Sequence, residues 1–364
     1  MTQIGIPYYF MRGGSSRGPY FKRQDLPNDL DHLSEVLISA VGSGHPLNID
    51  GIGGGNAVTT KVAMLSLSND EWADIDYFFA QVSVEDRLVD YKPTCGNILA
   101  GVGAAAIEMG LVKAENQMTS IKIRSINTNA KITAHVQTPN NQVKYDGSCV
   151  IDGVPGSAAP VELEFLNVAG SSTGAFLPTG NLIDKFDDIE VTCMDVAMPL
   201  VIARAKDFGL IGTETVNELN QNNEFFTKME RVRLAAGQAM GMGDCSKSVT
   251  PKFGLMAPHK DKNHVIVRYF MPWKTHPSMA VTGGQCLASC ALTPGTIADG
   301  MMQSLNHNPS NVTLLHPSGK LDVKVAYEIA NNIFQHYSTT VTRTCRKLAQ
   351  GQVFIPESIW RRSK

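Results

Sequence analysis

Val58-Thr59-Thr60-Lys61, in the first half of the chain, is matched in the second half by Val249-Thr250-Pro251-Lys252. A glycine-rich turn precedes each tetrapeptide, covering Gly51 to Asn56 in one half and Gly241 to Asp244 in the other. Such self-similarity is the usual trace of an internal repeat. Chance produces one match of this length readily, so a duplication requires a second match.

The second match follows each lysine at a similar distance. Thr94-Cys95-Gly96-Asn97 opens a helix rich in alanine and glycine, and Thr282-Gly283-Gly284-Gln285 opens a helix that contains Cys286 and Cys290. Two matches in the same order favour a duplication. We therefore predict two pseudo-symmetric halves, residues 1–180 and 181–364, divided within a Gly-, Ser-, Thr- and Pro-rich stretch, with the last strands free to pack on the first half.

Length and composition agree with two domains of a globular protein. The chain has 364 residues, more than the roughly 250–300 at which a single core usually stops growing. Hydrophobic residues make up 43% and charged residues 18%, and the net charge of −2 gives no footprint for nucleic acid or an anionic membrane. Met1 to Phe10 do not match a secretory signal, and no apolar run approaches the ~18 residues of a membrane span. We expect a cytoplasmic protein, either monomeric or homo-oligomeric.

The pattern of short apolar runs predicts more strands than helices. Strands are expected at 77–84, 121–136, 161–165, 264–271 and 321–326, and helices at 31–41, 97–109, 224–240 and 285–292. This mixture is typical of an α+β fold rather than a regular βαβ repeat.

The seven cysteines are odd in number and show no CxxC pair, which indicates free thiols in a reducing compartment. Cys286 and Cys290 lie four apart on a predicted helix without a histidine or carboxylate at ligand spacing, so small packing residues are the default and no metal is expected. Cys149, Cys193, Cys245 and Cys345 are interpreted in the same way.

Each half offers a helix N-terminus, whose free N–H groups and positive dipole end bind carboxylates well. Two such termini would suit a substrate with two carboxylates. The loop from Arg12 to Gly18, with two arginines and two serines among glycines, is a further group of anion-binding donors. A plain turn is the better interpretation of any one of these motifs alone. Their repetition in both halves favours anion binding.

Lys61 and Cys95 are the candidate catalytic residues. Cys95 precedes the predicted helix, where the dipole favours the thiolate. Lys61 begins the apolar run Val62 to Leu65, a predicted buried strand, where partial desolvation favours the neutral amine and makes lysine a usable general base. Taken singly, each is more often structural than catalytic. Lys252 has the same setting as Lys61 without a cysteine partner, and its role is left open between carboxylate binding and structure.

Two other motifs are less informative. Gly51 to Asn56 does not follow an apolar strand and lacks the last glycine of a dinucleotide-binding loop, so we reject that interpretation. His276 and His316 each precede a proline and are more often turn residues, although His276 is kept as a candidate substrate contact.

As a set, the motifs resemble the PrpF-like members of the diaminopimelate epimerase superfamily, which include 2-methylaconitate isomerases, 3-methylitaconate isomerases and 4-oxalomesaconate tautomerases. The resemblance spans nearly the whole chain: Met11 to Gly18, Ile49 to Gly54, Thr60 to Ala63, Cys95 to Asn97, Asp152 to Gly156 and Val281 to Gly283. It implies a duplicated epimerase-like fold, each half a curved sheet around a central helix. The family's catalytic lysine and cysteine fall on Lys61 and Cys95.

The family's carboxylate-binding loops fall on Arg12 to Arg17, Gly54 to Asn56 and Thr282 to Gly284. Altogether we expect these residues to bind substrate: Arg12, Ser15, Ser16, Arg17, Gly54, Gly55, Asn56, Thr60, Gly96, Asn97, His276, Thr282, Gly283 and Gly284. Ser15 and Arg17 stand where family members usually carry Thr and Lys, which keeps a hydroxyl and a cation. Racemases of the superfamily place a second cysteine opposite the first, whereas Thr282 here precedes Gly283. This difference argues against a two-thiol epimerase.

The expected activity is a cofactor-independent isomerisation by an allylic 1,3-proton shift in a small di- or tricarboxylate, most like a 4-oxalomesaconate tautomerase. A 2-methylaconitate isomerase and a 3-methylitaconate isomerase remain alternatives, as does a non-catalytic carboxylate-binding protein. The sequence leaves open which of Lys61 and Cys95 removes the proton and which returns it.

Overall fold

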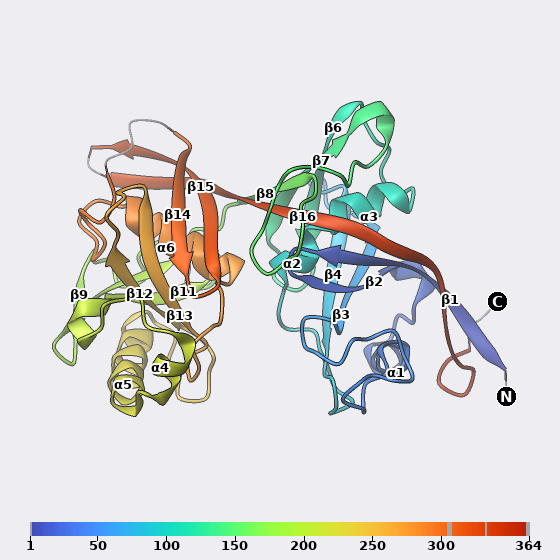
Figure 1. Cartoon of the computed structure of the whole chain (residues 1–364), viewed down its shortest axis with the longest axis horizontal. Coiled ribbons are helices and arrows are strands. Elements are labelled where there is room, and N and C mark those ends of the chain that lie inside the picture. The colour runs from blue at the N-terminus through green and yellow to red at the C-terminus, as the bar shows by residue number, and fades with distance from the viewer. Residues whose placement is uncertain (1, 304–307, 332, 362–364) are drawn as a thin grey trace. The chain divides into compact units, whose positions relative to one another are not determined.

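The chain builds the same succession of strands and helices twice. The computed structural model describes residues 2–303, 308–331 and 333–361. The chain divides into unit 1, Met1–Glu164 with Thr342–Lys364, and unit 2, Phe165–Val341. The last part of the chain therefore belongs with its beginning, and the first and last strands pair from Gln3 with Pro356 onwards (Figure 1).

The elements are few helices among many strands, which confirms the predicted α+β class. Unit 1 contains β1 Gln3–Gly13, β2 Ser16–Lys22, α1 Leu30–Val41, β3 Lys61–Leu67, β4 Ile75–Val82, β5 Val89–Asp90, α2 Gly96–Leu99, α3 Val102–Glu108, β6 Gln117–Ser125 and β7 Lys131–Thr138. Unit 2 contains β9 Asp184–Phe186, β10 Ile189–Asp195, β11 Pro199–Arg204, α4 Val216–Gln221, α5 Asn223–Ala239, β12 Lys252–Pro258, β13 His264–Phe270, α6 Val281–Leu292, β14 Ser310–His316 and β15 Gly319–Ala330. Strands β8 Pro160–Leu166 and β16 Ile333–Pro356 run through the two division points, and the short 3₁₀ turns η1, η2 and η3 cover Arg23–Asp25, Pro139–Asn141 and Ala205–Phe208.

The strand pairings repeat from one unit to the other. In unit 1, β1–β2 is antiparallel, β2–β3 parallel, β3–β4 antiparallel, β4–β6 parallel and β6–β7 antiparallel. In unit 2, the corresponding five pairs from β10–β11 to β14–β15 follow the same alternation. Lys61 begins β3 and Lys252 begins β12, so the two matching tetrapeptides occupy equivalent places. The strand pairings are therefore repeated in the two units, as the matching tetrapeptides predicted.

Helix α1 covers one face of the unit 1 sheet. Asp29 caps its N-terminus by accepting a hydrogen bond from the His32 N–H, and the helix ends at Gly42, which is in the left-handed region. Leu33, Val36, Leu37 and Ala40 form a buried stripe at helical spacing. This stripe packs with side chains of the neighbouring strands into one core cluster. In unit 2, α5 has the same role and packs against β9 to β13.

The other face of each sheet holds the second set of helices. In unit 2 this is α6, which is buried on all sides because its first three turns consist largely of Gly, Ala, Ser and Cys. Cys286 and Cys290 are fully buried there, as expected of packing residues. In unit 1 the predicted helix over 97–109 is two pieces, α2 and α3, interrupted at Ala100 and Gly101. A Cβ atom at Gly101 would lie 2.5 Å from the Tyr20 hydroxyl, so the close approach of that ring requires glycine.

Candidate active site

Lys61 lies at the start of β3 with its ammonium group held by neighbours on β4. Its Nζ donates a hydrogen bond of 2.6 Å to the Gln81 side-chain oxygen and lies 5.4 Å from the centre of the Phe79 ring. Gln81 is paired directly with Lys61 across the two strands. The side chain is half-buried, as the sequence predicted for a lysine at the beginning of an apolar strand.

Gln81 is itself fixed, and sequence analysis did not identify it. Its amide nitrogen lies within 3.1–3.3 Å of three acceptors, the Ala57 and Val82 carbonyl oxygens and the Thr60 hydroxyl. Because the nitrogen faces these acceptors, the amide oxygen faces Lys61 and acts as an acceptor only. The lysine therefore uses one N–H on Gln81, and the described residues supply no second hydrogen-bond acceptor to it. Only the cross-strand register between β3 and β4 reveals this partner.

Cys95 is the N-cap residue of α2, the position predicted for it. The thiol is half-buried, whereas Cys193, Cys245, Cys286, Cys290 and Cys345 are buried. Two fully buried tyrosines hold this segment: the Tyr77 hydroxyl donates to the Cys95 carbonyl oxygen at 3.3 Å, and the Tyr20 hydroxyl to that of Ile98 at 2.5 Å. Burial raises the pKa of both phenols well above its usual value. Both tyrosines therefore stay protonated and act as donors.

Lys61 and Cys95 lie on the same face of the unit 1 sheet. Tyr77, Phe79 and Gln81 alternate along β4 and so project to one side. Gln81 meets the lysine at one end of this row, and Tyr77 meets the Cys95 carbonyl at the other. The rings of Tyr77 and Phe79 lie side by side, with centroids 6.4 Å apart. The row of three β4 side chains thus links the two candidate catalytic residues within one unit.

The hairpin between β1 and β2 lies against Lys61 and the start of α2. A Cβ atom at Gly18 would lie 1.7 Å from the Lys61 carbonyl oxygen, and one at Gly14 would lie 2.1 Å from the Asn97 side-chain oxygen. Only glycine permits these approaches. Asn97 also donates to the Ser15 hydroxyl at 3.2 Å. The predicted substrate loop, Lys61 and the start of α2 are therefore neighbours.

The residues of this hairpin differ in whether their polar groups are already hydrogen-bonded within the protein. Arg12 is turned inward, donating to the Gly14 carbonyl at 2.8 Å and to the carbonyl and hydroxyl of Thr344 at 3.0 Å, and burial lowers its pKa. It holds the hairpin shape. Arg17 is exposed, and its guanidinium lies beside Gly54 and 5.6 Å from the Phe10 ring centre. The Ser16 hydroxyl is buried and has no partner among the described residues, so it keeps a free donor.

The glycine-rich turn before β3 is built by its own hydrogen bonds. The Asn48 side-chain oxygen accepts from the Gly55 N–H at 2.7 Å, and the Asn56 side-chain oxygen accepts from the Val58 N–H at 3.1 Å. Thr60 is buried and donates to the Val82 carbonyl oxygen at 2.7 Å, so its hydroxyl supports the strands. Gly54 and Asn56 are exposed at the turn. Gly96, the first residue of α2, is half-buried.

The remaining predicted residues lie in unit 2 around the start of α6. His276 packs edge-on against the Tyr269 ring with centroids 5.8 Å apart, and its Nδ1 accepts from the Ser278 N–H at 3.0 Å. Burial, and after it the charge of nearby Lys252, lowers the pKa of His276. Thr282, Gly283 and Gly284 form the first turn of α6, which begins at Val281. A Cβ atom at Gly283 would lie 2.3 Å from Tyr269, so that ring and the helix start are in contact.

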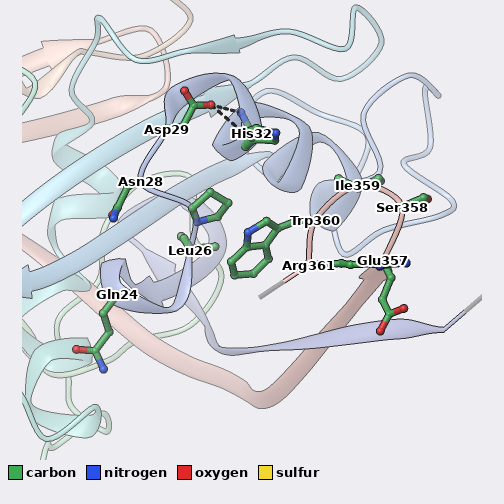
Figure 2. A pocket seen from close by; sticks show the side chains of 11 residues that line it. Gln24, Leu26, Asn28, Asp29, His32, Glu357, Ser358, Ile359, Trp360 and Arg361 are labelled. Atoms are coloured by element: carbon green, nitrogen blue, oxygen red, sulfur yellow. Dashed lines mark hydrogen bonds and ion pairs between the residues drawn. The ribbon is translucent and has the colours of Figure 1, made fainter. Parts of the chain in front are cut away.

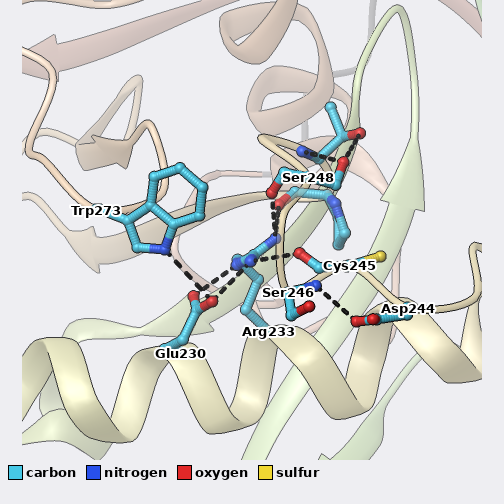
Figure 3. Close-up of polar contacts among 9 residues, drawn as sticks. Glu230, Arg233, Asp244, Cys245, Ser246, Ser248 and Trp273 are labelled. Carbon is cyan, nitrogen blue, oxygen red and sulfur yellow. Dashed lines mark hydrogen bonds and ion pairs between the residues drawn. The ribbon is translucent and has the colours of Figure 1, made fainter.

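An ion pair between buried Arg233 and half-buried Glu230 holds the turn that leads to Lys252 (Figure 3). Arg233 is 0% exposed, and its guanidinium donates two hydrogen bonds of 2.7 Å to the Glu230 carboxylate. The same guanidinium donates to three carbonyl oxygens of the turn, those of Cys245, Ser248 and Pro251. The Trp273 N–H points at Glu230 from the other side, at 3.4 Å. Every charge of the pair is compensated.

A large pocket in unit 1 lies away from these residues. It encloses about 890 Å³ beside the first turn of α1 and the last described segment of the chain. Figure 2 shows Asp29 and His32 pointing at each other on its rim and Trp360 next to Leu26. The His32 Nδ1 and the Asp29 carboxylate are 3.1 Å apart. Asp29 caps α1, and Trp360 packs on the core. These residues serve the fold, and none of the predicted site residues lines this pocket. The residues around Lys61 and Cys95, on the opposite face of the sheet, are the better candidates for a functional site.

Comparisons with known proteins show which family the chain resembles. The PrpF protein family model matches residues 3–356. A protein of Escherichia coli (strain K12), YbhH, named provisionally as an isomerase without a substrate, is 46% identical over 96% of this chain and 99% of its own length. The (4E)-oxalomesaconate Delta-isomerase of Novosphingobium sp. (strain KA1) is 40% identical, covering 96% of this chain and 97% of its own.

Solved structures give the same fold. The crystal structure of a methylitaconate-delta-isomerase superposes with a TM-score of 0.89 at 32% identity, covering 100% of both chains. A protein from Agrobacterium radiobacter K84, titled a probable proline racemase, superposes with a TM-score of 0.53 at 12% identity, covering 97% of this chain and 94% of its own. This second likeness concerns the fold alone, and it confirms the expected epimerase-like architecture. Sequence and structure together establish that this chain belongs to the PrpF family.

Proposed function

We propose that this protein is an isomerase that moves a double bond within a small unsaturated di- or tricarboxylate by a 1,3-proton shift. The observation that carries the proposal is the placement of Lys61 and the half-buried thiol of Cys95 on one sheet face. The lysine there is fixed by a neutral acceptor, and the hairpin beside it keeps free hydroxyl and cationic donors. These are a proton-transfer pair and an anion-binding loop in one place.

The chemistry needs no net oxidation. One of the two residues removes a proton from the carbon next to a carboxylate or keto group, breaking a C–H bond and leaving a dienolate. The double bond moves as the other residue returns a proton at the far carbon, forming a new C–H bond. Charge that develops on oxygen in the intermediate is stabilised by nearby N–H, hydroxyl and cationic groups, of which Arg17 and Ser16 are the free candidates in unit 1.

Among substrates, we favour the oxalomesaconate type. An isomerase named for that compound is 40% identical to this chain, and a 4-oxalomesaconate tautomerase from Pseudomonas putida is 39% identical. The methylitaconate isomerase whose structure superposes so closely supports the second candidate, methylitaconate. A 2-methyl-aconitate isomerase, 31% identical, supports the third.

The test offers oxalomesaconate, methylitaconate and 2-methylaconitate to the protein in deuterated water. Ultraviolet absorbance follows the change in conjugation, and proton NMR follows deuterium entering the far carbon. We expect one compound to isomerise, and Lys61→Met and Cys95→Ser to abolish turnover. The matched controls are Lys122→Met and Cys149→Ser, which remove an ordinary lysine and another half-buried cysteine from the same unit. Full activity in both active-site variants would overturn the assignment, and exchange without a change in conjugation would indicate an epimerase instead.

A further inference from the structure

A second pocket lies wholly within unit 2, where strands β13 and β14 separate. The last pair of their parallel ladder is Ile266 with Leu315, and the chain then turns from β14 into β15. The pocket at this point encloses about 270 Å³, and a single water needs only about 10–15 Å³, so a small ligand has room there. Its lining residues are Arg268, Pro277, Pro317, Ser318 and residues 213–216.

Arg268 projects from β13 to the side of the sheet that α5 covers. It alternates along the strand with Ile266 and Phe270, which pack with side chains of α5. Tyr269, which points to the other side, contacts Gly283 of α6. The Arg268 side chain therefore points away from α6 and from the predicted substrate-binding residues at the start of that helix.

Arg268 is buried, and only part of its guanidinium is hydrogen-bonded. It is 6% exposed, and its Nε donates to the Glu214 carbonyl oxygen at 2.9 Å while its Nη1 donates to that of Val267 at 2.8 Å. A guanidinium has five N–H donors, so others remain, and Nη2 has no acceptor among the described residues. Within the same described ranges, no carboxylate lies at ion-pair distance from Arg268.

The positive charge of Arg268 is thus incompletely compensated. Burial lowers its pKa, and the charge of the Glu214 carboxylate partly offsets this effect. That carboxylate is already committed, since its oxygens accept from the Ile211 and Gly212 N–H groups at 2.7 and 2.9 Å. A guanidinium stays protonated in proteins, so it cannot reduce the cost of burial by losing a proton. An anion in the pocket would lower that cost.

We propose that this pocket is a binding site for a small oxyanion, held by the N–H groups of Arg268 that have no partner in the protein. The donor determines the ligand class, because the planar guanidinium presents N–H groups that match the oxygens of a phosphate or a carboxylate group. The hydroxyl of Thr213, an exposed residue of the pocket lining, has no hydrogen-bond partner in the described part of the chain and is a second donor. The site lies within unit 2 and does not depend on the proposed isomerase activity.

Isothermal titration calorimetry tests the site with inorganic phosphate and, separately, with acetate, at an ionic strength fixed by sodium chloride. We expect one of these anions to bind, which identifies the kind of oxyanion. Arg268→Met should weaken that binding by about 10- to 100-fold, as for the loss of a charged hydrogen bond. Arg231→Met is the matched control, because it removes an exposed arginine of unit 2 that already pairs with Asp187, and it should bind the anion normally.

A second pair of variants leaves Arg268 in place, because Arg268→Met also removes two hydrogen bonds to the backbone. Thr213→Glu supplies a carboxylate to the pocket and should prevent anion binding, whereas Thr213→Gln has nearly the same size without the charge and should retain binding within about threefold. Wild-type protein that binds neither phosphate nor acetate would overturn the proposal. Equal affinities in Thr213→Glu and Thr213→Gln, or wild-type affinity in an Arg268→Met protein that folds normally by circular dichroism, would overturn it as well.

Discussion

Under the proposed mechanism, Gln81 should control how well Lys61 transfers protons by positioning its side chain rather than by contacting the substrate. Its oxygen accepts the lysine N–H at 2.6 Å, and its nitrogen is held by Ala57, Thr60 and Val82. A hydrogen bond to a charged group contributes about 1.5–3 kcal/mol. If Gln81→Met loses that orientation, kcat should fall by about 10- to 100-fold, because each 1.4 kcal/mol is a factor of about ten.

Gln81→Glu tests the electrostatic part of the same idea. It keeps the shape but places a carboxylate against the ammonium group, which favours the charged lysine. If Lys61 is catalytic, one limb of the pH–rate profile should then move to higher pH, because a neighbouring carboxylate favours the protonated form of an amine. Movement of the acidic limb would identify Lys61 as the base, and movement of the basic limb would identify it as the acid.

Steady-state kinetics over pH, with thermal melting as a check on folding, measure both effects. Gln137→Met, a half-buried glutamine on β7, is the matched control and should leave kcat unchanged. A Gln81→Met enzyme with wild-type kcat, or a Gln81→Glu enzyme whose profile does not move on either side, would refute the positioning role. A fall in melting temperature that alone accounts for the lost activity would do the same.

Two predictions concern stability. Arg233→Met leaves Glu230 and the carbonyl groups of the turn unpaired, so urea unfolding should show a loss of about 3–5 kcal/mol; an unchanged midpoint would contradict the role of this pair. Burial lowers the pKa of His336 to about 4, below the ~6.5 of an unfolded histidine, so the unfolded chain binds the proton first. Stability from this residue is complete above pH 6.5 and should fall by about 3 kcal/mol as the pH drops to 4. In His336→Phe, flanked by Phe176 and Phe334, that part of the pH dependence should disappear.

The elements that the sequence predicted well are those with strong local signals. Helix α1 has a capping aspartate, a buried stripe and a terminal glycine, and the prediction was one residue short at its start. The apolar run after Lys61 is strand β3, and the predicted 121–136 strand is the hairpin of β6 and β7. The break between α2 and α3 was missed, because it depends on the approach of Tyr20, a residue distant in sequence.

In the candidate site, too, local sequence motifs were recognised and contacts between distant residues were not. Lys61 and Cys95 could be predicted because each stands in a repeated motif. Arg12 and Thr60 matched the family pattern, and both make hydrogen bonds within the protein: Arg12 donates to Thr344, from the far end of the chain, and Thr60 donates to Val82. Gln81 was missed for the opposite reason. It lies in an ordinary strand, and only pairing between strands shows that it faces the lysine.

The two repeats show how a duplicated fold can acquire an asymmetric function through few changes. Both keep a lysine at the start of the equivalent strand, since β3 and β12 enter the sheet in the same way. The residue opposite decides what the lysine can do. With Gln81 opposite, one N–H of Lys61 is committed to a hydrogen bond that orients the side chain. The ladder between β12 and β13 begins one residue after Lys252, at Phe253 and Phe270, so Lys252 has no paired residue equivalent to Gln81 in that ladder. Cys95 is a second difference between the units. The first turn of α6 has Gly283 and Gly284 where a symmetric, two-base epimerase would need a second thiol.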